Sequence, residues 1–324
     1  MSSIIVASIP AHGHITPMLA VAGDLVRRGD DVRFVTGSRF ADKVAATGAT
    51  FVPLPAEADF DLEQFVQRFP ERTKLKGLKA GTFDLENLLA RPAKAQYETL
   101  MDALAARPTD AVLAEPLFFG AALLLEHQRP PRPAVVKCSV VPLPIDSRDT
   151  APFGLGLPPA RLFNRQRNAA LAALNRRILL RANQSVSDQY RQVHGKDMPG
   201  TLFDWGRRAD ALVQFSVPSF EYPRTDAPPN LHYVGPLSAT GSVAPLPDWW
   251  DDLDGTRPVI HVTQGTVANT DYEQVIAPTL RALADDDVLI VVSTGGRPLE
   301  SLPALPPNAR AATFLPYDEL LPLA

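Results

Sequence analysis

The sequence predicts an α/β protein with two doubly wound parallel-sheet domains, the second of them truncated. Short apolar runs alternate with segments of helical periodicity in both halves, as expected when helices cover both faces of parallel strands. A chain of 324 residues also exceeds what one hydrophobic core usually organises. A stretch of linker composition at 236–256 separates the halves, so we expect domains at 1–235 and 257–324.

The first domain begins with an expected strand, loop and helix. Residues 4–8 form a continuous apolar run, and apolar side chains then recur at helical spacing over 17–28. Pro17 suits a first helical turn, and Gly29 suits a left-handed cap after the last turn. The pattern continues with strands expected at 32–36, 51–54, 111–114, 134–141, 211–217 and 231–234, and with helices expected at 40–46 and 160–194.

The same alternation restarts after the linker. We expect strands at 259–262, 288–293 and 311–314, with a helix at 272–284. A doubly wound half normally needs five or six strands. Since only three are expected here, we predict a truncated sheet that leaves apolar faces uncovered around 291–314.

Composition excludes several classes of protein. Hydrophobic residues make up 45% and charged residues 21%, with a net charge of −4, so neither nucleic acid nor a membrane is an expected partner. No apolar run approaches the roughly 20 residues that span a bilayer. The N-terminal run lacks the cationic start of a signal peptide, and we interpret it as a buried strand. The single cysteine, Cys138, fits a reducing compartment, so a cytoplasmic location is expected.

Two histidines occupy the loop expected after the first strand. His12, Gly13 and His14 follow a strand end and precede a helix, where doubly wound folds place functional sites. A dinucleotide-binding loop would carry the pattern G-x-G-x-x-G here, so a nicotinamide oxidoreductase is disfavoured. A lone histidine is more often structural, but at this edge we interpret His14 as a candidate general base.

Glu115 directly follows the strand expected at 111–114. In the strand order 3-2-1-4, the first and fourth strands flank the switch point, so the loops that follow them meet in one crevice. We therefore predict that the Glu115 carboxylate lies within hydrogen-bond reach of His14 and orients its ring. The alternative is that Glu115 only caps the next helix.

Segments in order along the whole chain carry a family resemblance. They are IPAHGHITPMLAVAGDLVRRGDDVRFVT at 9–36, SRDTAPFGLGLPP at 147–159, FEYPR at 220–224, VGPL at 234–237, HVTQGTVAN at 261–269, VSTGGRP at 292–298 and FLPYDELLP at 314–322. Together they resemble the UDP-glycosyltransferase superfamily, particularly its bacterial macrolide and natural-product branch. The resemblance implies two Rossmann-like domains facing a cleft, the glycosyltransferase B-type fold. It also implies inverting, metal-independent transfer, without a cofactor, from a nucleotide-sugar (UDP or TDP) to a hydroxyl of a small lipophilic acceptor.

The resemblance also implies roles for individual residues. By position, the general base falls on His14, and its usual aspartate partner falls on Glu115, which is one methylene longer. Phe314 takes the place of the aromatic residue that stacks on the nucleotide base, and the backbone of Leu315 would bond the base edge. Tyr317 stands where plant members carry glutamine.

Further candidates are expected to line the cleft. Acceptor contacts are expected from residues after strand ends, with core packing as the alternative for both phenylalanines: His12, Phe118, Phe119, Pro142 and Phe153. Donor contacts are expected from strand-end loops, with a tight turn as the alternative for the paired glycines: Gly13, Gly265, Thr266, Gly295, Gly296 and Arg297. The arginines between 160 and 194 are interpreted as a solvated face.

Family members continue with a glycine-rich loop and a helix that receive the diphosphate, and these are not among the 324 residues. We therefore expect this chain alone neither to bind nucleotide-sugar tightly nor to turn it over. One alternative is a non-catalytic, transferase-like helper protein. A second alternative, less favoured, is a nucleotide-sugar epimerase, for which the second domain shows no acid or base groups placed to reach a sugar carbon.

Overall fold

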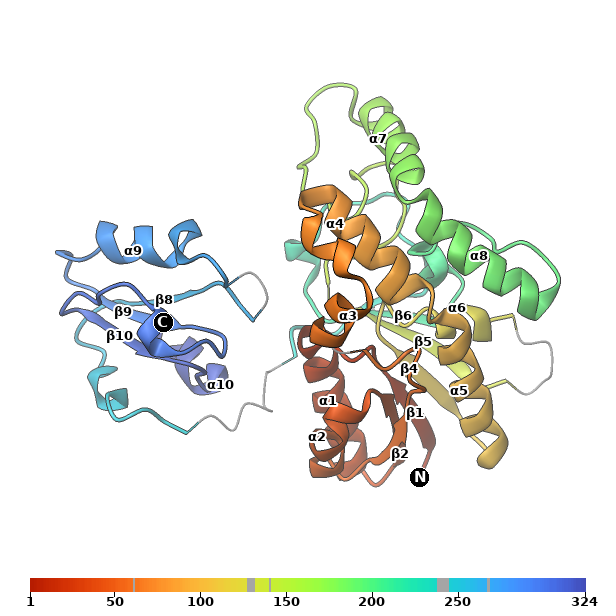
Figure 1. The fold of residues 1–324 in the computed structure, drawn as a ribbon, viewed down its shortest axis with the longest axis horizontal. Coiled ribbons are helices and arrows are strands. Elements are labelled where there is room, and N and C mark those ends of the chain that lie inside the picture. The colour runs from red at the N-terminus through yellow and green to blue at the C-terminus, as the bar shows by residue number, and fades with distance from the viewer. Residues whose placement is uncertain (61, 127–131, 140, 238–244, 267–268) are drawn as a thin grey trace. The chain divides into compact units, whose positions relative to one another are not determined.

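The computed structural model describes residues 1–60, 62–126, 132–139, 141–237, 245–266 and 269–324 (Figure 1). The chain divides into two compact units, Met1–Leu237 and Ser238–Ala324. This division falls two residues after position 235, where the first domain was expected to end. Of the expected linker at 236–256, residues 238–244 lie outside the described part, and 250–252 form a short 3₁₀ turn.

The described residues of unit 1 form a seven-stranded sheet in the order β3-β2-β1-β4-β5-β6-β7 (Figure 1). Every neighbouring pair is parallel, and the predicted order 3-2-1-4 is confirmed. The strands are β1 Ser3–Ala7, β2 Asp31–Thr36, β3 Thr50–Pro53, β4 Ala111–Ala114, β5 Ala134–Ser139, β6 Ala211–Gln214 and β7 Leu231–Tyr233.

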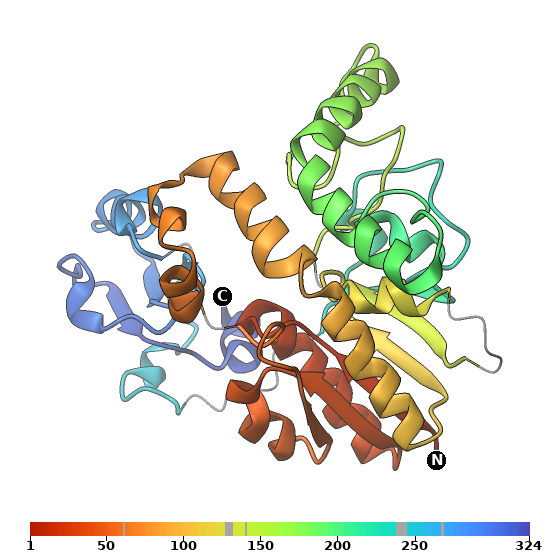
Figure 2. The ribbon, with the colours of Figure 1, turned by 45° about the vertical axis from the view of Figure 1, so that its right-hand side comes forward.

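Helices cover both faces of this sheet (Figure 2). Because side chains alternate along a strand, Ile4 and Val6 of β1 pack in one core cluster with Met18, while Ile5 and Ala7 pack in another with Leu100. The helices of unit 1 are α1 His12–Arg27, α2 Ala41–Ala46, α3 Leu62–Arg68, α4 Gly77–Asp84, α5 Ala93–Ala106, α6 Gly120–Leu124, α7 Asn164–Ile178 and α8 Leu180–His194.

Helix α1 begins five residues earlier than predicted. Ile15 is buried one turn before Met18, so the apolar stripe extends toward the N-terminus and brings the first turn into the helix. Pro17 consequently lies inside α1 rather than at its start, where it cannot donate to the Gly13 carbonyl. His12, Gly13 and His14 are therefore the first residues of a helix, and not a loop.

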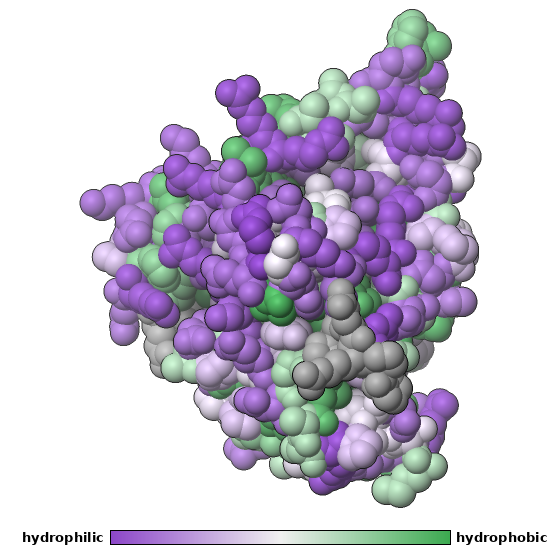
Figure 3. All heavy atoms as spheres, turned by 90° about the vertical axis from the view of Figure 1, so that its right-hand side faces the viewer, coloured by the Kyte–Doolittle hydropathy of each residue, from purple (hydrophilic) through white to green (hydrophobic). Residues whose placement is uncertain are grey.

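The segment expected to be helical over 160–194 is two helices that meet at Leu179. Asn164 begins α7, and its side-chain oxygen accepts from the Ala160 amide. Its arginines are mostly exposed, which confirms the interpretation as a solvated face. Figure 3 shows a largely hydrophilic surface on the side of the molecule that it presents. None of the helices in the described part of the chain is both long and apolar enough to cross a membrane.

Unit 2 holds a parallel three-stranded sheet in the order β10-β9-β8 among its described residues. The expectation of uncovered sheet faces is wrong for β9: Ile276 and Leu280 of α9 cover one of its faces, while Leu315 and Leu320 pack with its other face. The elements are β8 Val259–Thr263, α9 Ile276–Ala282, β9 Leu289–Ser293, β10 Ala309–Ala312 and α10 Tyr317–Leu320.

Several predicted ends differ from the structure. The strand expected to reach 141 ends at Ser139, and residue 140 lies outside the described part. The strand expected to reach 217 ends at Gln214. The strand expected over 311–314 lies two residues earlier, because Ala309–Ala312 pairs with β9. Phe314 is therefore placed beyond the strand, in the connection to α10.

Candidate active site

The first turn of α1 places His14 against Glu115, which follows β4. Strands β1 and β4 pair in parallel, with Ala7 opposite Ala114, so the chain leaves both strands at the same edge of the sheet. His14 Nδ1 lies 2.7 Å from Glu115 Oε2. The predicted contact is confirmed.

Glu115 is fully buried and is held in place by the backbone. Its Oε2 also accepts from the Leu117 amide at 3.0 Å, and its Oε1 accepts from the Ile9 amide at 3.4 Å. Donors of this kind stabilise the charged carboxylate in a buried position. The alternative of a simple helix cap is wrong, since α6 begins at Gly120 and has no side-chain cap.

Glu115 sets the electrostatics of His14. Burial lowers the pKa of His14, but the charge of Glu115 and its hydrogen bond outweigh burial and leave that pKa above its ordinary value. The side chain keeps 19% of its surface accessible. Because Glu115 engages Nδ1, Nε2 is the ring nitrogen left to exchange a proton with a bound molecule.

His12 lies in a different environment two residues earlier. It is exposed, and its ring meets the Phe40 ring edge-on at 5.0 Å. Partial desolvation of its ring, followed by the positive charges of Lys43 and Arg39, lowers the pKa of His12. The neighbouring Gly13 is also exposed, and a β-carbon added there would meet nothing within 4 Å.

The residues predicted to contact the acceptor differ in how far the structure exposes them. Phe118 and Phe119 are completely buried in the main core of unit 1, so core packing is the correct interpretation and their side chains line no open surface. Phe153 is half-buried, with its ring 5.3 Å from the Phe203 ring. Pro142 is exposed. The phenylalanines at 118 and 119 turn inward because the chain after β4 leads directly into α6, which is itself buried.

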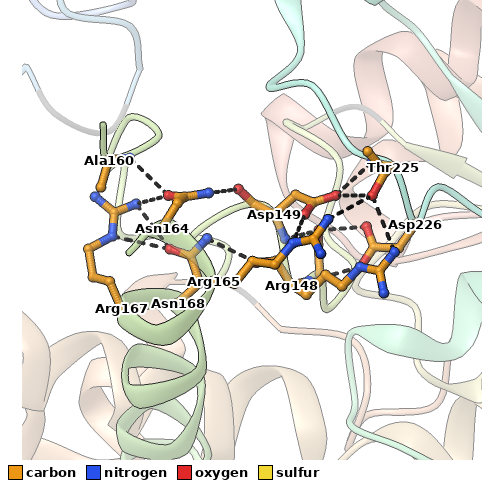
Figure 4. Close-up of polar contacts among 10 residues, drawn as sticks. Arg148, Asp149, Ala160, Asn164, Arg165, Arg167, Asn168, Thr225 and Asp226 are labelled. Atoms are coloured by element: carbon orange, nitrogen blue, oxygen red, sulfur yellow. Dashed lines mark hydrogen bonds and ion pairs between the residues drawn. The ribbon is translucent and has the colours of Figure 1, made fainter. Parts of the chain in front are cut away.

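A polar network anchors the long loop between β5 and α7 (Figure 4). The Asp149 carboxylate accepts from Arg165 Nε at 3.0 Å and from the amide and hydroxyl of Thr225 at 2.7 and 2.6 Å. The Arg148 amide donates to Asp226 at 2.8 Å. These bonds tie the loop to α7 and to the segment before β7. The sequence contains no local signal for them, because Thr225 and Asp226 are more than 70 residues away from their partners on the loop.

In unit 2, the loops after β8 and β9 meet through glycines. Gly295 has a φ of 66°, and a β-carbon there would lie 2.1 Å from the Gly265 carbonyl oxygen. Gly296 has a φ of 96°, and a β-carbon there would lie 2.9 Å from Phe314 Cζ. The paired glycines therefore do more than form a turn, since they admit a neighbouring backbone and an aromatic ring.

The groups proposed for donor contacts differ in what they expose. Phe314 is 51% accessible, whereas Leu315 is 2% accessible and packs in the core. Thr266 is exposed, but the Gly265 amide, expected to face a phosphate, donates to Thr263 Oγ1 at 3.2 Å. Phe314 and Thr266 are therefore the exposed side chains among these groups.

Arg297 and Tyr317 make contacts inside unit 2. The Arg297 guanidinium lies 5.7 Å from the centre of the Tyr272 ring. The Tyr317 hydroxyl lies 2.9 Å from Ser293 Oγ, which lies 3.1 Å from His261 Nε2. Sequence reasoning identified neither Ser293 nor His261, which lie on neighbouring strands and meet only through strand pairing.

Gly295→Ala is expected to destabilise unit 2 by more than about 1 kcal/mol, because a β-carbon cannot occupy the space against the Gly265 carbonyl. Urea unfolding followed by the fluorescence of Trp249 and Trp250 measures the change. Gly255→Ala is the matched control, since Gly255 has a φ of 75° but open space around it. Equal losses in both variants would show that positive φ alone, and not the close approach, sets the cost.

Comparison with known proteins identifies the family of this chain. Residues 4–124 match the family described as the glycosyltransferase family 28 N-terminal domain. The chain is 39% identical over 324 residues to 4'-demethylrebeccamycin synthase of Lentzea aerocolonigenes, covering 98% of this chain and 75% of that protein. It is 34% identical to UDP-glycosyltransferase 2 of Phaeomoniella chlamydospora, covering 98% of this chain and 73% of that protein.

Solved structures share the fold. The glycotransferase of kitacinnamycin superposes with a TM-score of 0.67 at 18% identity, covering all of this chain and 74% of that one. The calicheamicin glycosyltransferase CalG4 gives 0.62 at 23% identity, covering all of this chain and 73% of that one. With two relatives above 30% identity that match nearly the whole chain, this protein belongs to the UDP-glycosyltransferase superfamily of glycosyltransferases.

Proposed function

We propose that this glycosyltransferase moves a sugar from a nucleotide-sugar to a hydroxyl group of a small lipophilic acceptor, with inversion and without a metal ion. The observation that carries the proposal is the pair formed by His14 and Glu115, 2.7 Å apart at the edge of the first sheet. A histidine oriented by a buried carboxylate is a general base suited to near-neutral pH.

In the proposed reaction, the acceptor hydroxyl binds with its proton toward His14 Nε2. The oxygen attacks the anomeric carbon as Nε2 takes the proton, and the bond from that carbon to the diphosphate breaks with its electrons going to the leaving oxygen. A single displacement of this kind inverts the anomeric configuration. Glu115 stabilises the imidazolium that forms, because its charge and its bond to Nδ1 favour the protonated ring.

The donor site is proposed for the strand-end loops of unit 2. Phe314 offers a half-exposed ring supported by Gly296, and an aromatic face can stack on any base. Structural neighbours support a nucleoside diphosphate here: VinC was solved in complex with DTDP and SsfS6 in complex with thymidine diphosphate. The lipophilic acceptor is supported by Phe153, which is half-buried on the anchored loop of unit 1.

Phe314→Ala is expected to raise the KM of the nucleotide-sugar about tenfold with little change in kcat, since stacking on one base contributes about 1–3 kcal/mol. Initial rates of the full-length protein at varied donor concentration measure it. Phe220→Ala, an exposed phenylalanine of unit 1, is the control and should leave donor KM unchanged. A Phe314→Ala variant with wild-type donor KM would contradict the stacking of the nucleotide base on this ring.

Product analysis tests the reaction itself. The full-length protein is incubated with UDP- and TDP-sugars and a panel of aromatic alcohols and phenols, with and without a chelator, and the anomeric configuration of the product is read by NMR. We expect inversion and chelator-resistant turnover. Retention of configuration, or activity abolished by the chelator and restored by a divalent cation, would contradict the proposal.

A further inference from the structure

A lysine is completely buried beside the His14–Glu115 pair. Lys137 lies on β5 in register with Ala114, the residue directly before Glu115. Lysine is almost never fully buried unless its ammonium is partnered. Here Nζ donates to two backbone carbonyl oxygens, those of Phe203 at 2.7 Å and Pro144 at 3.3 Å. The ammonium therefore bonds to the backbone of two separate segments.

The turn that receives this lysine is shaped around it. Nζ lies 4.9 Å from the centre of the Trp205 ring, close enough for a cation–π contact. A β-carbon at Gly206 would lie 2.7 Å from Lys137 Cδ, so the turn approaches the side chain as closely as a glycine allows. These contacts make the ammonium the junction between β5, the Phe203–Gly206 turn and the loop that carries Pro144.

One of the two segments joined by Lys137 carries Phe153, the aromatic residue proposed for the acceptor, and the other carries Phe203. Phe153 lies further along the Pro144 loop, and its ring packs edge-on against the Phe203 ring at 5.3 Å. Glu115, in contrast, has its own bonds from the amides of Ile9 and Leu117. Lys137 therefore bonds directly to the loop that carries Phe153, whereas backbone amides hold the Glu115 carboxylate. Trp205, which contacts Lys137, also donates to the Pro116 carbonyl at 3.1 Å.

We propose that Lys137 is a positioning residue for the loop between β5 and α7. By bonding to the Pro144 carbonyl of this loop and to the Phe203 carbonyl of the turn, it holds the loop in the arrangement that binds the acceptor. The proposal rests on the proposed function of the chain. Neutralising the ammonium removes its charge and one of its three donors, so both carbonyl bonds weaken and hold the loop to the turn less strongly. Acceptor affinity falls, while the general base stays in place.

The charges around Lys137 make this function dependent on pH. Burial lowers the pKa of Lys137 to about 7, against the attraction of Asp204 and Glu115. Arg207 pairs with Asp204 at 3.1 Å, which reduces that attraction. Burial raises the pKa of the adjacent Cys138 to about 12, so this thiol stays neutral, and the register partner on β6 is the apolar Leu212. Acceptor KM should accordingly rise as pH increases through the pKa of Lys137.

Steady-state kinetics of the full-length protein and its Lys137→Met and Lys137→Arg variants test the proposal. At about pH 6.5, below the lysine pKa, Lys137→Met should raise acceptor KM about tenfold, with donor KM unchanged and kcat within about threefold. The rise of wild-type acceptor KM between about pH 6 and pH 9 should disappear in both variants. Lys137→Arg, which stays charged, should bind acceptor better than Lys137→Met at the upper end of that range. Lys196→Met, an exposed lysine, is the control.

Two results would overturn this role. One is a Lys137→Met variant whose acceptor KM and pH profile match the wild type; the other is a variant that loses kcat and donor affinity in equal measure, as general damage would produce. If neither variant folds, as thermal unfolding would reveal, the wild-type acceptor Kd decides, since a Kd independent of pH contradicts the proposal. Full-length wild-type protein that binds acceptor with the expected pH dependence but transfers no sugar would refute the proposed function instead.

Discussion

His14→Ala is expected to lower kcat by about a hundredfold or more, the usual contribution of a general base. Without the imidazole, the attacking hydroxyl has no group to take its proton, and Glu115 is left buried without its partner. Initial rates of the full-length protein at saturating donor and acceptor measure the loss. Because the missing interaction acts in the transition state, kcat should fall much more than either KM rises.

His12→Ala is the matched control for this experiment. The two histidines are separated by one residue, but His12 is exposed and packs against Phe40. Its removal should change kcat far less than the removal of His14. Equal losses at both positions would contradict the assignment of His14 as the base.

Glu115→Gln is expected to lower kcat on the order of a hundredfold and to move the acid limb of the pH profile to lower pH. Catalysis needs neutral His14, so kcat rises as pH increases through the pKa of that ring. Glu115 raises this pKa against the effect of burial, and a neutral glutamine removes the charge that does so. The pKa of His14 therefore falls in the variant, while the plateau drops because the imidazolium loses its stabilising carboxylate. Profiles of kcat from about pH 5 to pH 9 show both effects.

Glu115→Asp separates charge from reach. It keeps the carboxylate but shortens it by one methylene, so it should retain more of the raised His14 pKa than glutamine does. An acid limb that stays in place in Glu115→Gln would mean that the limb does not report His14. A plateau that stays in place would mean that Glu115 does not support the base.

Local sequence patterns and the positions of strand ends were sufficient to predict the first sheet and the contact between His14 and Glu115. The apolar runs of unit 1 identify its strands because parallel strands are buried on both faces and allow few polar residues. The sequence predicted that His14 and Glu115 lie close together, because each follows a strand and neighbouring parallel strands end at the same edge of the sheet. That inference needs only strand order, which short connections and right-handed crossovers restrict to few possibilities.

The sequence did not predict the direction in which a side chain points after a strand ends. Phe118 and Phe119 have the composition of a binding wall, but the buried path of α6 turns both into the core. Apolar character drives both outcomes, since the hydrophobic effect has no direction of its own. Only the packing of distant segments distinguishes a wall from a core.

The contacts between residues far apart in the chain depended wholly on tertiary structure. Lys137 interrupts an apolar strand in the sequence, and only the fold shows that the Phe203–Gly206 turn packs over it and supplies the Phe203 carbonyl oxygen. Gly296 looks like half of a turn until the Phe314 ring comes to rest against it. The sequence alone therefore determined which segments become strands and which polar groups lie at their ends, because these depend on local periodicity. The contacts of Lys137 and Gly296 depend instead on three-dimensional packing, which brings Phe203 to Lys137 across 66 residues and Phe314 to Gly296 across 18.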